Sequence, residues 1–265
     1  MYIEVAAHRG NVAEYPENTM PAYRSSYEIG ADMIELDLHM TKDGEIVLIH
    51  DDNLARTADV SGKIRELTLD EILRADVGIK TGETFRGTRV PTLRQFCEFV
   101  ASENDTMQFN FEFKDYFRDG EEWAKVCADK IIEMVDCYGL WERSFVNSFD
   151  GGLLKYIEQK YDGRFRLHGF YPYSILGDTL PNKLYCACLL KYHNPDGSPA
   201  FEGLVNPKKD FDALIADGVR PWVAASIRTI EDMKHAVSLG AELITSNEPA
   251  FMISELKKAG LRVKE

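Results

Sequence analysis

The chain has 265 residues, of which 45% are hydrophobic and 28% are charged, a balance typical of soluble globular proteins. This length suits one large α/β domain or two small ones. The formal net charge of −13 argues against nucleic acid and anionic membrane surfaces as partners, because both would repel an acidic protein.

Segments with strand and helix patterns alternate along the whole chain. An apolar strand at 2–10 is followed by a helix at 18–30, which Asn18 or Thr19 can cap, and by a strand at 31–38. Further strands are expected at 107–114, 144–149, 164–171, 185–192, 221–227 and 241–247. Further helices are expected at 90–103, 121–139, 229–240 and 250–260. Eight strand–helix units predict a parallel sheet of the size of a closed (β/α)₈ barrel, a single-domain TIM barrel over residues 1–265.

A ninth strand-like segment, 45–52, does not fit this alternation. The sequence "TKDG" at 41–44 places Asp43-Gly44 between two β runs, which is a strong hairpin signal. The segment should therefore run antiparallel to the second strand, as a β-hairpin excursion after it. It would return His50 to the height of Asp37, at the C-terminal face where active sites of these barrels lie.

Three carboxylates are expected to converge at that face. Glu35 and Asp37 are two residues apart, so both point to the same side of their strand, and Glu112 and Lys114 repeat the pattern on the neighbouring core strand. Such carboxylates repel one another unless a cation lies between them. Three hard oxygen ligands suit Mg²⁺ or Ca²⁺, although ion pairs on a solvated rim are the alternative.

Two histidines and an arginine accompany the carboxylates. His8 ends the first strand and should lie at the same face as His50. One histidine can accept a proton while another donates one, the two roles that phosphodiester cleavage needs. Arg9 offers a planar guanidinium that matches phosphate oxygens. Taken alone, His8 could be a structural hydrogen-bonding residue and Arg9 part of a structural ion pair.

The joint order of these motifs resembles the glycerophosphodiester phosphodiesterase family over essentially the whole chain, from His8 to Pro249. The resemblance rests on "HRG", "PENT", Glu35-x-Asp37, "TKDG", "HDDNLARTADVSGKI", "LTLDEI", "VPTL", Glu112-x-Lys114, "NSF" and Trp222. It implies a barrel enzyme that hydrolyses glycerophosphodiesters, such as glycerophosphocholine and glycerophosphoethanolamine, to glycerol 3-phosphate and an alcohol. It also implies dependence on one divalent cation, Mg²⁺ or Ca²⁺.

The resemblance assigns roles to the central residues. His8 and His50 match the catalytic histidines of the family, and Glu35, Asp37 and Glu112 match its metal ligands. Which histidine is the acid and which the base stays open, as does the formation of a cyclic phosphate.

Five further residues match surrounding positions of the family site. Arg9 and Lys114 match phosphate contacts, and Glu17 and Asn18 match residues that shape the floor of the site. Trp222 is expected to line the pocket, where its ring face could contact glycerol or a choline cation.

Two departures from the family pattern lie late in the chain. Residues 223–225 are Val-Ala-Ala where the family often has Thr-Val-Asn after the tryptophan, and "TSNEP" at 245–249 replaces "T-D-x-P". We expect both departures to affect the alcohol-binding side of the pocket without touching the metal or the histidines.

Two other functions remain open. A phospholipase D-like lyase could cyclise lysophospholipid headgroups on the same barrel, with the aromatic residues of 168–176 forming an apolar approach. A non-catalytic metal-binding barrel would instead explain the two departures as lost activity, although His8, His50 and all three carboxylates are intact.

We expect a cytoplasmic protein with a small-molecule substrate. The N-terminus lacks the basic start and long apolar run of a signal peptide. No run approaches the roughly 18 apolar residues of a membrane helix, so stable membrane insertion is not expected. Five cysteines without regular spacing argue for a reducing compartment. The oligomeric state, the headgroup and the physiological metal are left open.

Overall fold

Strands and helices alternate along the chain in the predicted order. The computed structural model describes residues 1–103, 106–177 and 181–263. Its strands are β1 (Glu4–Ala7), β2 (Met33–Met40), β3 (Ile46–Leu48), β4 (Gln108–Phe113), β5 (Ser144–Asn147), β6 (Arg166–Tyr171), β7 (Leu184–Leu189), β8 (Arg220–Val223) and β9 (Leu243–Ser246). Its α-helices are α1 (Met20–Glu28), α2 (Leu69–Ile72), α3 (Leu93–Ser102), α4 (Glu121–Cys137), α5 (Gly151–Lys160), α6 (Lys208–Ala216), α7 (Ile230–Ser238) and α8 (Pro249–Lys258).

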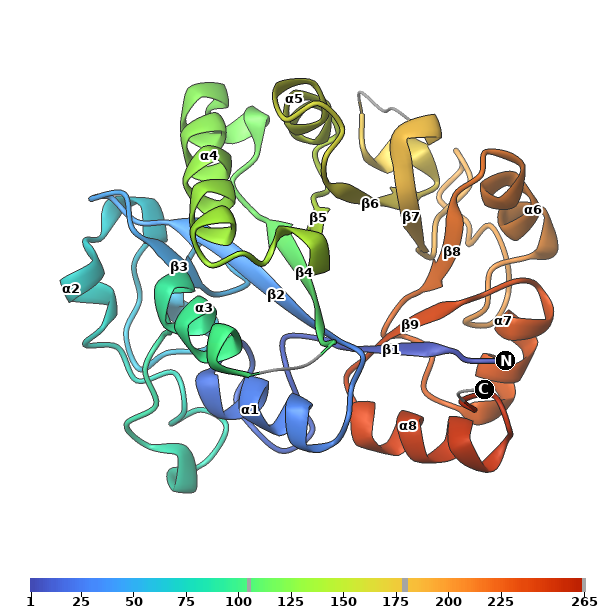
Figure 1. Ribbon diagram of the computed structural model, residues 1–265, viewed down its shortest axis with the longest axis horizontal. Coiled ribbons are helices and arrows are strands. Elements are labelled where there is room, and N and C mark those ends of the chain that lie inside the picture. The colour runs from blue at the N-terminus through green and yellow to red at the C-terminus, as the bar shows by residue number, and fades with distance from the viewer. Residues whose placement is uncertain (104–105, 178–180, 264–265) are drawn as a thin grey trace.

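Eight of the strands in the described ranges close into a parallel barrel, with helices around its outside (Figure 1). The ring closes because β1 pairs in parallel with both β2 and β9. The predicted (β/α)₈ barrel is therefore confirmed. Of the helices that the structure describes, none is long and apolar enough to cross a membrane.

The ninth strand, β3, lies outside the barrel as the hairpin signal predicts. It runs antiparallel to β2, with Leu38 paired to Leu48, and the turn contains Gly44 at a φ of 85°, which glycine adopts without steric cost. The backbone N–H of Ile49 then donates a 3.1 Å hydrogen bond to the carbonyl oxygen of Asp37. This bond fixes the next residue, His50, beside the C-terminal end of β2.

Helix starts follow local sequence signals. At α3, Thr92 and Gln95 form a reciprocal capping box. At α1, Thr19 is the N-cap residue and Pro21 lies in the first turn, where its missing N–H costs nothing. Within the described residues the Thr19 side chain makes no capping hydrogen bond, so the start of α1 is marked by Pro21.

The strand register decides which side chains face the barrel interior. One row runs through Asp37, Glu112, Asn147 and His168, which are paired in turn across β2, β4, β5 and β6. Residues paired in this way point to the same face of the sheet. The polar row therefore lines the C-terminal part of the interior.

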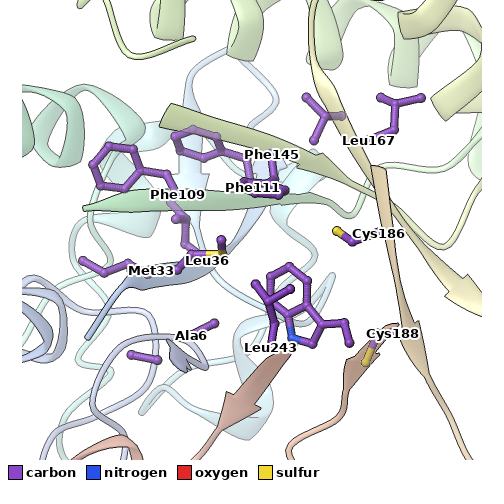
Figure 2. Close-up of a cluster of buried hydrophobic side chains, with 14 of the residues drawn as sticks. Ala6, Met33, Leu36, Phe109, Phe111, Phe145, Leu167, Cys186, Cys188 and Leu243 are labelled. Atoms are coloured by element: carbon purple, nitrogen blue, oxygen red, sulfur yellow. The ribbon is translucent and has the colours of Figure 1, made fainter. Parts of the chain in front are cut away.

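Beneath this polar row the interior carries an apolar layer. Ala6, Met33, Cys186 and Leu243 come from four different strands and are buried together (Figure 2). The ring of Phe145 meets the ring of Trp222 edge to face at a centroid distance of 6.2 Å. This packed layer closes the barrel beneath the polar row.

Candidate active site

The three carboxylates singled out by the sequence meet at the C-terminal end of the barrel. Asp37 is paired with Glu112, and Glu35 precedes Asp37 by two residues, so all three side chains point inward. One carboxylate oxygen of each lies within 4.8 Å of the others, and all three residues are buried. The predicted ligand set is thus brought together in space.

Cations and an amide surround Asp37. Lys114 Nζ lies 3.1 Å from Asp37 Oδ1 and also contacts Glu112 Oε1, while Arg9 Nε lies 3.4 Å from Asp37 Oδ2. Asn18 Nδ2 donates a 2.7 Å hydrogen bond to Asp37 Oδ2. Burial alone would raise the pKa of Asp37, but Lys114 and Arg9 hold this pKa well below its usual value. Asp37 is therefore the ionised member of the cluster.

The other two carboxyl groups are destabilised as anions. Burial, together with the charges of Asp37 and Glu112, raises the pKa of Glu35 well above its usual value. Burial also raises the pKa of Glu112, although Lys114 opposes this shift. Glu35 Oε1 accepts no hydrogen bond, and neither does Asp37 Oδ1, which faces Lys114 at ion-pair distance only. Buried oxygens without donors beside like charges fit a divalent cation, so this cluster could hold one.

A cavity of about 270 Å³ opens at the cluster. Six of the predicted site residues line it: His8, Arg9, Glu35, His50, Glu112 and Lys114. The backbone N–H of Arg9 donates a 2.8 Å hydrogen bond to Glu35 Oε2, which ties the loop after β1 to the carboxylates. The cavity therefore exposes both histidines and both cations to one bound molecule.

The two histidines have different partners. His50 Nδ1 lies 2.6 Å from Asp51 Oδ1, whereas His8 Nδ1 lies 2.6 Å from the amide oxygen of Asn247. Burial and the charge of Arg9 lower the pKa of His8 to about 4. Burial also lowers the pKa of His50, but its contact with Asp51 opposes the shift. His50 is thus better able to carry a positive charge.

The contact between Asn247 and His8 corrects one expectation. The sequence predicted that the "TSNEP" departure would not touch the histidines, yet Asn247 is the direct partner of His8. The reason is the closure of the barrel, because β9 pairs with β1 and brings residues 239 positions apart together.

Arg56 links the His50 side of the site to Arg9. It donates hydrogen bonds to Asp51 and, through both terminal nitrogens, to Glu17 at 2.8 and 2.7 Å. Glu17 in turn accepts a 3.0 Å hydrogen bond from Arg9. Arg56 belongs to the "HDDNLARTADVSGKI" motif, but the sequence analysis gave it no role. Glu17, which was predicted to shape the floor of the site, thus bridges Arg9 and Arg56.

Asn18 holds the opposite side of Asp37. It adopts a φ of 53°, a left-handed conformation that asparagine tolerates better than most residues. Its Oδ1 accepts a 2.8 Å hydrogen bond from Tyr23, and its Nδ2 is left to donate to Asp37. Both Glu17 and Asn18 therefore orient charged residues of the site.

Trp222 is placed differently from the expectation. It is completely buried, and Nε1 donates a 2.8 Å hydrogen bond to Thr245 Oγ1. Its ring stacks face to face on His168, at a centroid distance of 4.2 Å, and it is His168 that lines the cavity. The predicted contact between the Trp222 ring and the substrate is wrong for this geometry, because the ring is fully buried and Trp222 does not line the cavity.

Three neutral polar residues of the cavity wall were missed from the sequence. Asn110, Asn147 and His168 come from β4, β5 and β6, and all three are buried. Asn147 appeared only as part of the "NSF" motif, and His168 only within a possible apolar approach. The alternation of side chains along each strand could have indicated them. To use it, one must know which face of each strand points inward, and for β5 and β6 that depends on the strand register.

Comparisons with known proteins identify the family of this chain. The model of the "Glycerophosphoryl diester phosphodiesterase family" matches residues 8–188. A glycerophosphodiester phosphodiesterase of Caldanaerobacter subterraneus subsp. tengcongensis is 30% identical over 97% of this chain and 98% of its own length. The chain belongs to this family of phosphoric diester hydrolases. The matched range, 8–188, contains His8, His50, Glu35, Asp37 and Glu112, whereas both departures lie after it.

Solved structures support the family fold. The glycerophosphodiester phosphodiesterase of Agrobacterium tumefaciens superimposes with a TM-score of 0.73 at 20% identity, covering 96% of this chain and 100% of that one. A phosphodiesterase of Oleispira antarctica, solved in complex with the product sn-glycerol-3-phosphate, has a TM-score of 0.77 at 19% identity and covers 96% of both chains. At these identities the likeness establishes the barrel fold.

Proposed function

We propose that this chain hydrolyses glycerophosphodiesters, such as glycerophosphocholine or glycerophosphoethanolamine, to sn-glycerol 3-phosphate and an alcohol. The observation that carries the proposal is that two histidines, two cations and two of the three clustered carboxylates line one and the same cavity. The name of the family and the product bound to the Oleispira antarctica relative support the substrate class.

Glu35, Asp37 and Glu112 are proposed to hold one divalent cation, Mg²⁺ or Ca²⁺. When bound, this ion would supply Lewis-acid stabilisation of a phosphate oxygen. Arg9 and Lys114 would neutralise the charge that builds on the phosphate oxygens, since both cations line the cavity beside the carboxylates.

The hydrogen-bond partners of the two histidines support different catalytic roles for them. His8 faces a neutral amide and has a pKa of about 4, so it is neutral at pH 7 and suited to accept the proton of the nucleophile. His50 faces the carboxylate of Asp51, which stabilises an imidazolium. We assign His50 as the general acid that protonates the leaving alkoxide.

The test is a substrate panel on the purified chain. Glycerophosphocholine, glycerophosphoethanolamine and a lysophospholipid are assayed after EDTA treatment and after addition of Mg²⁺, Ca²⁺ or Mn²⁺. Release of sn-glycerol 3-phosphate that requires a divalent ion supports the proposal. Full activity after EDTA would contradict the metal site, and a cyclic product from the lysophospholipid would favour the lyase. Metal binding without turnover of any substrate would favour the non-catalytic barrel.

A further inference from the structure

The wall of the cavity opposite the first strand carries hydrogen-bonding atoms without partners. Asn110, Asn147 and His168 are 1%, 1% and 2% exposed, and all three line the cavity. Among the residues that the structure describes, Asn110 Nδ2, Asn147 Oδ1 and His168 Nε2 have no hydrogen-bond partner. A buried polar atom that has lost its water is costly to leave unpaired, so these atoms are arranged to meet a polar molecule in the cavity.

The His168 ring is fixed in orientation. It stacks on Trp222 with an interplanar angle of 5°, and the Trp222 ring is itself held by its bond to Thr245. Nδ1 lies 3.2 Å from Asn110 Oδ1, so Nδ1 carries the hydrogen and donates it. Nε2 is therefore a hydrogen-bond acceptor, on a ring that lines the cavity. Burial lowers the pKa of His168 to about 3, so the ring stays neutral and keeps this acceptor.

The chemistry of the three free atoms distinguishes among the parts of a phosphodiester. His168 Nε2 and Asn147 Oδ1 are acceptors, and Asn110 Nδ2 is a donor. Phosphate oxygens accept hydrogen bonds only, so they gain nothing from the two acceptors. A quaternary ammonium gains nothing from the donor. A hydroxyl group both donates and accepts, and it satisfies acceptor and donor together.

The geometry points to His168 as a specificity-determining residue that accepts a hydrogen bond from the terminal hydroxyl of the substrate's glycerol. Asn110 Nδ2 donates a hydrogen bond to the oxygen of the same hydroxyl. This inference rests on the proposed function. Around the barrel, β6 lies four strands from β1, which carries Arg9 at its end. A phosphate held by Arg9 therefore directs the hydroxyl farthest from phosphorus toward His168.

The experiment compares two substrates in the same enzyme preparation. One is the 4-nitrophenyl phosphodiester of glycerol, and the other is that of propane-1,2-diol, which lacks only the terminal hydroxyl. Wild type is expected to prefer the glycerol ester by about 10- to 100-fold in kcat/KM, because the analogue leaves buried polar atoms unpaired. His168→Phe keeps a ring to stack on Trp222 and is expected to reduce this preference to within about threefold of unity.

Matched variants separate recognition from folding. Because both substrates are cleaved by the same folded fraction, the ratio of their kcat/KM values does not depend on how much of the variant folds. His168→Gln, whose amide can replace Nε2, is expected to restore part of the preference. Cys188→Ala alters the same cavity wall on β7 and should change both kcat/KM values by the same factor.

Failure of this inference differs from failure of the proposed function. An active wild type that does not distinguish the two esters, or a His168→Phe variant that keeps the full preference, overturns the role of His168. A wild type that cleaves neither ester overturns the proposed function instead. In that case, calorimetry compares the affinity of the wild type for glycerol 3-phosphate with its affinity for propane-1,2-diol phosphate. Equal affinities overturn the role of His168.

Discussion

The cavity has two walls of different construction. The charged wall, formed by residues on and after β1, β2 and β4, holds Glu35, Asp37, Glu112 and their cations, and nearly every charged group has two or more partners. The neutral wall, formed by Asn110, Asn147 and His168 above the Trp222 ring, carries uncharged polar atoms without partners among the described residues, whereas the unpaired oxygens of the charged wall belong to the carboxylates Glu35 and Asp37. A wall whose charges are mutually fixed suits positioning for chemistry, whereas a wall with free neutral atoms suits recognition of a hydroxyl.

The largest effect is expected at the centre of the charged wall. Asp37→Asn removes the ionised carboxylate, and activity should fall by at least about 100-fold because a proposed metal ligand is lost. The fold should persist, since Lys114 keeps its contact with Glu112 and Arg9 keeps its ion pair with Glu17. Steady-state kinetics measure the loss of activity, and calorimetric titration with Mg²⁺ or Ca²⁺ measures the loss of metal affinity.

The matched control for this variant is Asp70→Asn, which removes an exposed carboxylate paired with Arg74. It should leave kcat/KM and metal affinity unchanged, because exposed ion pairs contribute little. If Asp37→Asn retains wild-type metal affinity, the three-carboxylate site is wrong. Asp37 is buried, so the far-UV spectrum of the variant must be compared with that of wild type.

Asp51→Asn tests the assignment of the two histidines. The Asp51 carboxylate favours protonated His50, so its loss lowers the pKa of His50 further. A general acid must carry its proton, and a lower pKa means that the proton is lost at lower pH. The alkaline limb of the pH profile of kcat/KM should therefore move to lower pH, with the acidic limb unchanged. Movement of the acidic limb instead would identify His50 as the base.

Asn247→Asp tests the other histidine with the opposite sign. A carboxylate beside Nδ1 stabilises the imidazolium, so the pKa of His8 should rise from about 4. A general base must be neutral, and activity is lost as the pH falls through its pKa. The acidic limb of the pH profile should therefore move to higher pH. Asn247→Ala, which removes the amide and adds no charge, should not move it upward; an equal upward shift in both variants would exclude the electrostatic explanation.

The two walls also differ in how far the sequence could predict them. Glu35 and Asp37 share one strand at a spacing of two, and Arg9 follows His8 directly, so local pattern and family resemblance placed the charged wall correctly. The barrel and the β3 hairpin were predictable for the same reason, because alternation and the Asp43-Gly44 turn are local signals. That residues 1–265 form one domain stays a prediction.

The neutral wall depends on register between strands, which local pattern does not determine. His168 faces the cavity because it pairs with Asn147, which pairs with Glu112. A shift of one residue in β6 would turn Leu167 inward instead. The contact between His8 and Asn247 needs the closure of the whole barrel. Trp222 was misplaced for the same reason, since its depth beneath His168 follows from the pairing of β7 with β8.

The smallest effect on activity, and a measurable one on stability, is expected beneath the neutral wall. Trp222 Nε1 has Thr245 Oγ1 as its hydrogen-bond acceptor, and the indole is completely buried. Thr245→Val keeps the volume but leaves this N–H unpaired, so the free energy of unfolding should fall by about 1–3 kcal/mol. Thr245→Ser keeps the hydroxyl and loses one methyl group, which costs about 0.8 kcal/mol. Urea unfolding of both variants measures the difference. If Thr245→Val proves the more stable of the two, packing and not the hydrogen bond holds the Trp222 ring under His168.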